Sequence, residues 1–436
     1  MTRGESCSLE RKGSEVPLEL LTRPGALRRR TAWLASFPAL ASLQNREFRL
    51  LWLGLIGAFL GSWMQQVAMG WWVFDKAHSA FLLGLVNASG ALPMLLLSLV
   101  AGVAADRLDR RRLLMITRSV QLVVVLTLAT LIAFDWATVW HVLAISLVSG
   151  VVFAFDIPAR QSLVPMLVER HQLMNAMALN SAVWNGSQIL GPAVAGNLVG
   201  FVGTAGCLFM AACLSLGIIV ALMMMRIPEG VQTARGDSLL GSIKDGLKTV
   251  RADELVMSMI AASAVIVIFG MPYAVFMPVF AGDVLNVGAS GLGFLMAATG
   301  VGALIGALGL ASLGDYEHKG ILLLAMGITF SVALISFSAS RWFPLSLGLL
   351  TVVGMSGTSA STIMTTFVLS RVEAEFQGRV MSVLMLAFGL QPVGSIMFGG
   401  MANMLGAPLA VAAGATICLV FIAGVFLRRP SLINAG

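Results

Sequence analysis

Long apolar stretches separated by short polar connections run through most of the chain, from Leu50 to Leu427. A helix needs about 20 mostly apolar residues to cross the hydrocarbon core of a bilayer. The chain lacks the alternation of apolar and polar residues that is typical of the strands of a membrane barrel. The pattern therefore predicts spanning helices at 50–74, 81–104, 113–134, 137–157, 176–200, 204–226, 255–281, 290–313, 320–340, 343–368, 380–402 and 406–427.

The longest connection between these stretches is polar and divides them into two blocks of six. The predicted fold is an all-α membrane protein with twelve transmembrane helices in two pseudo-symmetric six-helix bundles. Its parts are an N-terminal tail (1–49), a first bundle (50–226), a central loop (227–254), a second bundle (255–427) and a C-terminal tail (428–436). In the loop, the apolar positions of 238–253 predict an amphipathic helix on the membrane surface.

Basic residues lie almost entirely on one side of the predicted bundle. Of the 28 Lys and Arg residues, only Lys76 and Arg341 fall in odd-numbered connections; the tails and the even-numbered connections with their flanks contain the rest. By the positive-inside rule, both termini are cytoplasmic. The prediction is a multi-pass protein of the cytoplasmic (inner) membrane type.

The composition excludes most soluble classes of protein. The chain is 58% hydrophobic and 11% charged, whereas a soluble domain has about 25% charged residues. The net charge of +7 is spread over short loops, where it marks topology and lipid contact rather than a nucleic-acid partner. Four histidines and four cysteines lack metal-ligand spacing, and no phosphate-binding Gly-rich loop is present. We therefore expect no enzyme activity, no cofactor and no metal.

Two pairs of segments occupy matching places in the two halves. The segment 102–111 follows span two as 311–320 follows span eight, and 167–182 precedes span five as 370–387 precedes span eleven. Internal repeats of this kind are typical of secondary transporters, whose substrate site lies between the halves.

The segment GVAADRLDRR (102–111) resembles the signature loop of the major facilitator superfamily, with Asp109 where a glycine is usual. The segments 43–74, 78–107 and 156–181 resemble the bacterial exporter branch that includes enterobactin exporters and macrolide or multidrug efflux proteins. The resemblance covers residues 43–427 and implies alternating access with protons as the coupling ion. The expected partners are a small-molecule substrate, the lipid bilayer and protons, and the chain is expected to be a monomer.

The signature loop suggests a cytoplasmic gate of five residues: Gly102, Asp106, Arg107, Arg110 and Asp156. Gly102 would allow a close helix approach, and the resemblance implies that Asp106 meets the start of span eleven. Asp156, at the predicted cytoplasmic end of span four, is the expected partner of Arg107 and Arg110. This latch would hold the halves together when the protein is open outward. The alternative is a solvated loop that only marks topology, which we prefer for the last two arginines of the run, Arg111 and Arg112.

The segment GPAVAG (191–196) in span five resembles the antiporter motif of drug exporters, with Ala195 where a second glycine is expected. Its helix-bending and packing residues are Gly191, Pro192 and Gly196. A proline flanked by small residues lets a helix bend and pack closely during a transport cycle. Ordinary small-residue packing explains the segment equally well.

Uncharged polar residues at mid-depth are the substrate-binding candidates, because polar groups within a span usually face the bundle interior. With one phenylalanine that could form an apolar wall, they are Trp63, Gln66, Asn185, Gln188, Phe269, Tyr273 and Gln391. Hydrogen bonding between helices is the alternative for each. As a set they indicate a polar, uncharged cavity for a mostly neutral amphipathic substrate. Pro272 and Pro392 break their helices nearby.

None of the 21 Asp and Glu residues lies at the centre of a predicted span. Asp75, near the outer end of span one, is the best candidate for proton coupling, and an interfacial anchor is its alternative. The predicted function is secondary-active export of an amphipathic small molecule, such as a drug, a macrolide-like compound or a siderophore. The alternatives are a nutrient importer and a transport-inactive relative acting as a membrane sensor or assembly partner.

Overall fold

Helices form nearly all of the described chain, which comprises residues 38–225, 250, 253–314 and 318–428 of this computed structural model. In that part, 11 helices are long and apolar enough to span a membrane. One of them, α6 (Leu173–Met224), contains two crossings, because Gly203 has a φ of 74° and reverses the chain. Glycine adopts positive φ without steric cost, so no polar loop is needed there. The predicted fold class is confirmed.

The first half begins with the short helix η3 (Pro38–Gln44) and contains α2 (Arg46–Ala77), α3 (Ala80–Arg107), α4 (Arg110–Ala133), α5 (Val139–Leu167), η4 (Arg170–Gln172) and α6. Asn45, Ser79 and Asp109 cap the starts of α2, α3 and α4. Thr138 and His141 form a capping box at α5. These side chains satisfy backbone N–H groups that have no partner within the helix, so the connections can be short.

The second half contains α8 (Glu254–Val265), η5 (Ile266–Gly270), η6 (Met271–Phe276), α9 (Met277–Val279), η7 (Phe280–Val284), α10 (Gly288–Leu313), α11 (Lys319–Ala339), α12 (Phe343–Arg371), α13 (Ala374–Phe388), α14 (Gln391–Leu405) and α15 (Ala407–Arg428). Span seven runs from α8 to η7 and alternates between α, π and 3-10 geometry, because Pro272 and Pro278 lack the N–H that a continuous helix needs. Span eleven divides into α13 and α14 just before Pro392.

Several boundaries differ from the sequence prediction. Helix α5 continues to Leu167, ten residues beyond the predicted end of span four at 157. The last part of the predicted N-terminal tail is η3, and Ser42 Oγ lies 2.7 Å from Asn175 Oδ1 of α6. The predicted amphipathic helix at 238–253 lies outside the described residues, except for Val250 and Asp253.

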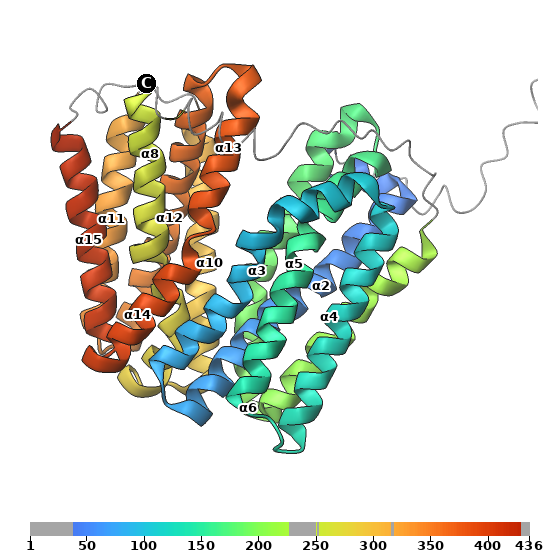
Figure 1. The fold of residues 1–436 in the computed structure, drawn as a ribbon, viewed down its shortest axis with the longest axis horizontal. Coiled ribbons are helices and arrows are strands. Elements are labelled where there is room, and N and C mark those ends of the chain that lie inside the picture. Colours follow the sequence, from blue (N-terminus) through green and yellow to red (C-terminus); the bar gives the residue numbers. More distant parts are fainter. Residues whose placement is uncertain (1–37, 226–249, 251–252, 315–317, 429–436) are drawn as a thin grey trace, which may run out of the picture.

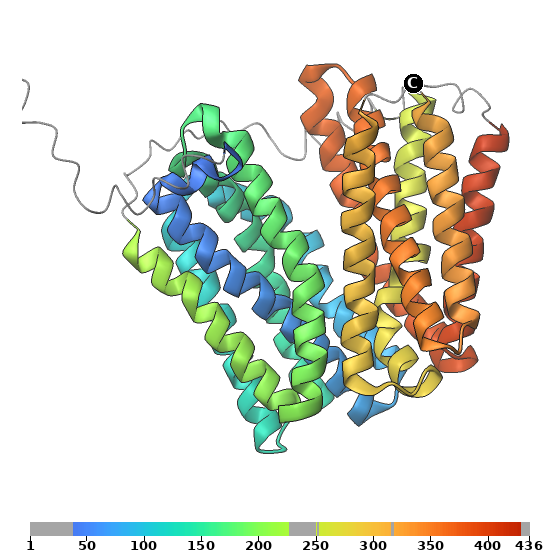
Figure 2. The same ribbon diagram turned by 180° about the vertical axis from the view of Figure 1, so that it is seen from behind.

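The two halves meet at one end and diverge toward the other (Figures 1 and 2). We call the end where the described chain begins and finishes the terminal side, and the other end the distal side. On the distal side the halves share one apolar core, in which Met64 and Leu208 of the first half join Phe276 and Leu292 of the second. On the terminal side each half has a separate core. The bundle is therefore closed at its distal side.

The described contacts between the halves lie on the distal side and at the middle of the helices. On the distal side Asn87 of α3 accepts a 3.0 Å hydrogen bond from Ser395 of α14, and Ser79 lies 3.3 Å from Asn403. At mid-helix, the Cβ position of Gly300 in α10 lies 3.2 Å from the carbonyl oxygen of Gln188 in α6. Nearer the terminal side, no atom lies within 4 Å of the Cβ position of Gly102 in α3 or Gly309 in α10.

Candidate functional site

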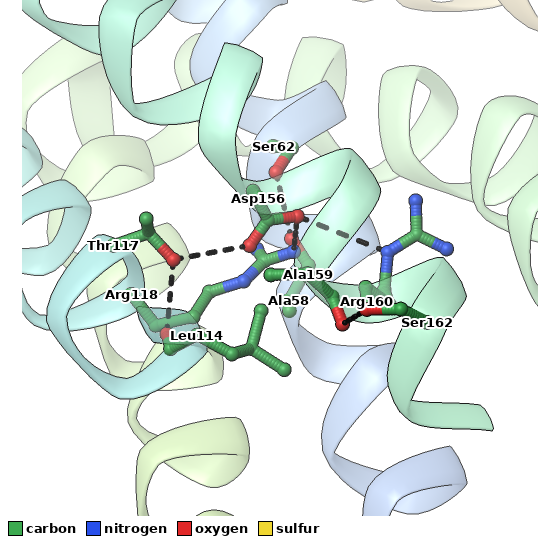
Figure 3. Close-up of polar contacts among 9 residues, drawn as sticks. All are labelled: Ala58, Ser62, Leu114, Thr117, Arg118, Asp156, Ala159, Arg160 and Ser162. Carbon is green, nitrogen blue, oxygen red and sulfur yellow. Dashed lines mark hydrogen bonds and ion pairs between the residues drawn. The ribbon is translucent and has the colours of Figure 1, made fainter. Parts of the chain in front are cut away.

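A buried cluster of charges lies inside the first half, between α4 and α5. Asp156 is 2% exposed, and Arg118 and Arg160 are each 7% exposed. Arg118 Nη2 donates a 2.6 Å hydrogen bond to Asp156 Oδ2, while Arg160 Nε lies 3.8 Å from the same oxygen. The hydroxyl of Thr117 lies 3.5 Å from the other carboxylate oxygen. Figure 3 shows Asp156 between the two arginines.

This geometry corrects two expectations from the sequence. Asp156 is eleven residues from the end of α5, or about 16 Å at 1.5 Å per residue, so an acid does lie within a span. Its partner is not Arg110, whose Nη1 is 3.5 Å from the carbonyl oxygen of Ser162 and 2.8 Å from Met166 Sδ. The predicted pairing was wrong for this conformation because it assumed that span four ended at Asp156.

Arg118 and Arg160 are functional candidates that the sequence analysis overlooked. Arg118 falls inside the predicted span 113–134, and a charge within a span is itself evidence for a functional site. Arg160 is four residues after Asp156, so the two share one face of a continuous helix. The shared helix face of Asp156 and Arg160 could be recognised only from the structure, because it depends on α5 continuing beyond the predicted end of span four.

Aromatic side chains extend from the charge cluster toward the middle of the bundle. The Cζ atom of Arg160 lies 4.8 Å from the ring centroid of Phe59 in α2, close enough for a cation–π contact. Phe59 packs edge-on against Trp184 of α6 at 5.1 Å between centroids, and Trp184 lies 5.9 Å from Trp63. A polar network joins α2, α4 and α5 nearby, in which Gln121 donates a 2.8 Å hydrogen bond to Gln65.

Of the gate residues on the signature loop, Gly102 is apart from other helices in this conformation. Gly102 has no close neighbour at its Cβ position, so the expected close helix approach is absent here. The side chains of Asp106 and Arg107 lie outside the described part of the chain. Asp109 caps α4 by accepting a 2.7 Å hydrogen bond from the N–H of Arg112, which is a reason for an aspartate at this position.

The last arginines of the loop have structural contacts or face solvent. Arg111 Nε donates a 2.7 Å hydrogen bond to the carbonyl oxygen of Leu222, and its Nη2 donates one of 3.1 Å to that of Met223, near the end of α6. Cations stabilise helix C-termini in this way. The side chain of Arg112 is exposed.

The segment 191–196 lies where α6 packs against α2 and α10. A Cβ at Gly196 would lie 2.5 Å from the carbonyl oxygen of Ala289 and 2.8 Å from Gly293 Cα of α10. One at Gly191 would lie 2.5 Å from Trp63 Cβ. The helix backbone continues through Pro192, and the non-helical residue in α6 is Gly203. The segment is thus a close-packing contact in this conformation.

Two of the four substrate candidates of the first half, Gln66 and Gln188, lie near the plane between the halves. Gln66 is exposed one turn before Gly70, whose Cβ position lies 3.4 Å from Pro278 of α9, so Gln66 faces the second half. The backbone of Gln188 touches α10, as described above. Asn185 is partly buried and donates a 2.9 Å hydrogen bond within α6 to the carbonyl oxygen of Ser181.

The candidates of the second half are less accessible. Tyr273 is 8% exposed and packs edge-on against Phe330. Phe269 packs edge-on against Phe398 within the same half. Gln391 is partly buried at the start of α14, and its carbonyl oxygen accepts a hydrogen bond from Ser395. The coupling candidate Asp75 is exposed near the distal end of α2.

Comparison with known proteins identifies relatives over nearly the whole chain. Residues 37–434 match the family described as Transmembrane secretion effector. The chain is 26% identical over 374 residues to the staphyloferrin A transporter of Staphylococcus aureus, covering 84% of this chain and 92% of that one. It is 26% identical over 392 residues to the multidrug efflux pump Tap of Mycolicibacterium fortuitum (87% and 95% covered). Macrolide efflux protein A of Streptococcus pyogenes is 23% identical over 368 residues (83% and 90% covered).

Solved transporters share the fold. A bacterial homologue of the human lysosomal transporter Spinster, in an inward-facing and occupied conformation, has a TM-score of 0.70 at 13% identity, covering 90% of this chain and 98% of that one. The nucleoside transporter NupG has a TM-score of 0.68 at 15% identity, covering 87% and 98%.

The fold and these matches together define a class of protein: a multi-pass membrane transporter of the major facilitator superfamily, not an enzyme. Within it, the chain belongs to the transmembrane secretion effector family. The family resemblance seen in the signature loop is confirmed.

Proposed function

We propose that this transporter exports an amphipathic small molecule across the cytoplasmic membrane by alternating access, in exchange for protons. Two of its relatives are named as efflux proteins, one for multiple drugs and one for macrolides, and a third as a transporter of staphyloferrin A. The substrates in those names differ, and together they support export of an organic compound of moderate size. The chain acts as a monomer.

The observation that carries this proposal is the distribution of the apolar cores. A shared core closes the distal side, while the terminal side has one core for each half. The basic residues predict that the terminal side is cytoplasmic. In that orientation the protein is open to the cytoplasm, which is the state in which an exporter receives its substrate.

Closing the cytoplasmic side is the role we assign to the gate residues Gly102, Asp106, Arg107 and Arg110. Of these, Gly102 has no close neighbour at its Cβ position and Arg110 contacts α5 of its own half, as expected of a latch whose side is open. Asp156, the fifth predicted gate residue, lies deeper in the first half and is engaged with Arg118 and Arg160. Substrate contacts are assigned to Gln66, Asn185 and Gln188, which line the first half.

The proposal is tested by efflux from cells that lack their own drug exporters and express this chain. Cells loaded with fluorescent dyes, macrolides or catecholate siderophores should retain less of at least one compound than vector controls. An uncoupler should restore retention to the control level. A Gly217→Ala variant controls for expression of an altered chain, because the Cβ position there has no atom within 4 Å.

Each contrary outcome has a specific meaning. Export that persists in the uncoupler contradicts exchange for protons. Increased uptake of a compound contradicts the assigned direction and favours an importer. Unchanged retention of every compound in cells with abundant protein contradicts export and favours a sensor or assembly partner.

A further inference from the structure

The buried cluster in the first half contains two guanidinium groups and a single carboxylate. Each of Arg118, Asp156 and Arg160 is more than nine-tenths buried. Arginine remains protonated in proteins, so one carboxylate leaves the cluster with an excess positive charge. Burial of unbalanced charge is unfavourable unless a counter-charge and hydrogen bonds compensate it.

Arg160 has unused hydrogen-bond donors. Its Nε is 3.8 Å from Asp156, beyond hydrogen-bond distance, and is buried without a partner. Its guanidinium makes no hydrogen bond to any residue that the structure describes. Figure 3 shows its two terminal nitrogens pointing away from Asp156. Arg118 Nε is likewise buried without a partner.

The face of α2 that contacts Arg160 leads to the plane between the halves. Phe59, under the Arg160 guanidinium, is followed one and two turns later on the same face of α2 by Ser62 and Gln66, both exposed. Gln66 faces the second half, as argued above. Trp63 Nε1, near Trp184, is a further buried donor without a partner.

We propose that Arg160, assisted by Arg118, binds the carboxylate of an acidic amphipathic substrate, whose apolar part packs on the partly exposed rings of Trp184 and Trp63. A guanidinium presents two parallel N–H donors to a carboxylate, and this geometry gives strong, oriented binding. Asp156 orients Arg118 and competes with the substrate for the arginines. The inference rests on the proposed export function and changes its substrate class from the neutral compounds suggested by the sequence to organic acids.

The test is a binding titration with two fluorescent probes that differ only in charge. Purified full-length protein in detergent micelles is titrated with dansyl-phenylalanine, which has a carboxylate, and with its amide. Wild-type protein should bind the acid at least about tenfold more tightly, since the carboxylate adds charge-assisted hydrogen bonds. Arg160→Gln should remove this preference by weakening the binding of the acid and not that of the amide. Arg160→Lys keeps the charge but loses the paired donors, so it should retain part of the preference for the acid.

Two further variants separate binding from stability. Arg170→Gln is the matched control, because Arg170 is exposed on η4, and it should change neither affinity. Asp156→Asn removes the competing carboxylate, so it should tighten binding of the acid and increase the thermal stabilisation that the acid provides. Replacing a residue that has only a structural role would instead weaken the binding of both probes. Size-exclusion profiles establish which variants are folded before titration.

Several results would overturn this assignment: equal affinities of wild-type protein for the two probes, equal losses for both in Arg160→Gln, or binding of neither. Displacement of the acid by phosphatidylglycerol at equal concentration would assign the arginines to a lipid headgroup instead. None of these results affects the export proposal, which is judged separately by the efflux of dyes, macrolides and catecholate siderophores from cells.

Discussion

A charged side chain inside a membrane helix needs other protein groups to replace the water that it has lost. Asp156 meets this requirement through Arg118 and Thr117. Because these groups come from α4 and the carboxylate from α5, the cluster also fixes the two helices relative to each other. Its members are therefore the residues at which single substitutions should have the largest effects.

Replacing Arg118 by methionine should strongly destabilise the protein. The substitution keeps an unbranched side chain but leaves Asp156 without its closest counter-charge, and breaking a buried ion pair costs about 3–5 kcal/mol. Thermal unfolding of purified protein should show a clear decrease in the melting temperature. Arg112→Met, at the exposed start of the same helix, is the control and should have little effect. Equal melting temperatures for the two variants would contradict a stabilising ion pair.

Asp106→Asn should abolish most transport while leaving expression intact. The latch proposed for the signature loop requires a charged carboxylate to meet the second half when the cytoplasmic side closes, since helix N-termini attract negative charge. The measurement is the rate of efflux at matched protein levels. Asp109→Asn provides the control, because asparagine caps a helix about as well as aspartate does. Undiminished efflux by the Asp106 variant would remove the latch from the mechanism.

At the scale of elements, close contacts of small residues join the two halves. Helices α6 and α10 approach at Gly196 and Gly293, and α3 approaches α14 at Gly84 and Ser395. Helix association in lipid depends on such close packing, because lipid tails provide no hydrophobic driving force between helices. These contacts hold the distal side closed, so their geometry controls whether the protein can pass to its other state.

A single methyl group at Gly196 should impair the transporter. Its Cβ would lie 2.5 Å from the carbonyl oxygen of Ala289, so α6 and α10 would have to separate, and such overpacking typically costs about 1–3 kcal/mol. We expect Gly196→Ala to lower both the melting temperature and the efflux rate. Gly217→Ala on the same helix adds the same methyl group in open space and should leave both unchanged. A Gly196→Ala variant with normal efflux would show that this contact is not needed.

At the scale of the whole molecule, alternating access requires the distal contacts to break once in each cycle. Ser79, which caps α3, and Asn403 of α14 lie 3.3 Å apart across the closed side. In a background without the native cysteines, the pair Ser79→Cys and Asn403→Cys should form a cross-link on oxidation that stops efflux, and reduction should restore it. Each single variant is the control. Efflux that continues in fully cross-linked protein would contradict opening at the distal side.

The orientation of the molecule can be tested by labelling from outside the cell. Arg341 lies in the connection between α11 and α12 on the distal side, and Arg170 lies in η4 on the terminal side. With cytoplasmic termini, Arg341→Cys should react with a membrane-impermeant maleimide in intact cells, whereas Arg170→Cys should react only after lysis. The reverse pattern would invert the proposed direction of transport.

The number of spans, their division into two halves and the family could be predicted from the sequence. These properties depend on the length and spacing of apolar stretches and on a local motif, and each stretch must form a helix in lipid whatever its neighbours are. The breaks before Pro272 and Pro392 were also predictable, because proline removes a backbone donor at its own position. The candidate site was only partly predictable: Gln66 and Gln188 lie near the plane between the halves, whereas Tyr273 lies within one of them.

The sequence by itself thus determined the class of protein, its twelve spans and the charge asymmetry that indicates its orientation. Only the tertiary structure decided that Asp156 pairs with Arg118 and that Arg160 retains unused donors. It also decided which side is closed, through the core that both halves share. The physical reason is that hydrophobic length acts within one helix, whereas the partner of a buried charge depends on how far each helix extends and how neighbouring helices align.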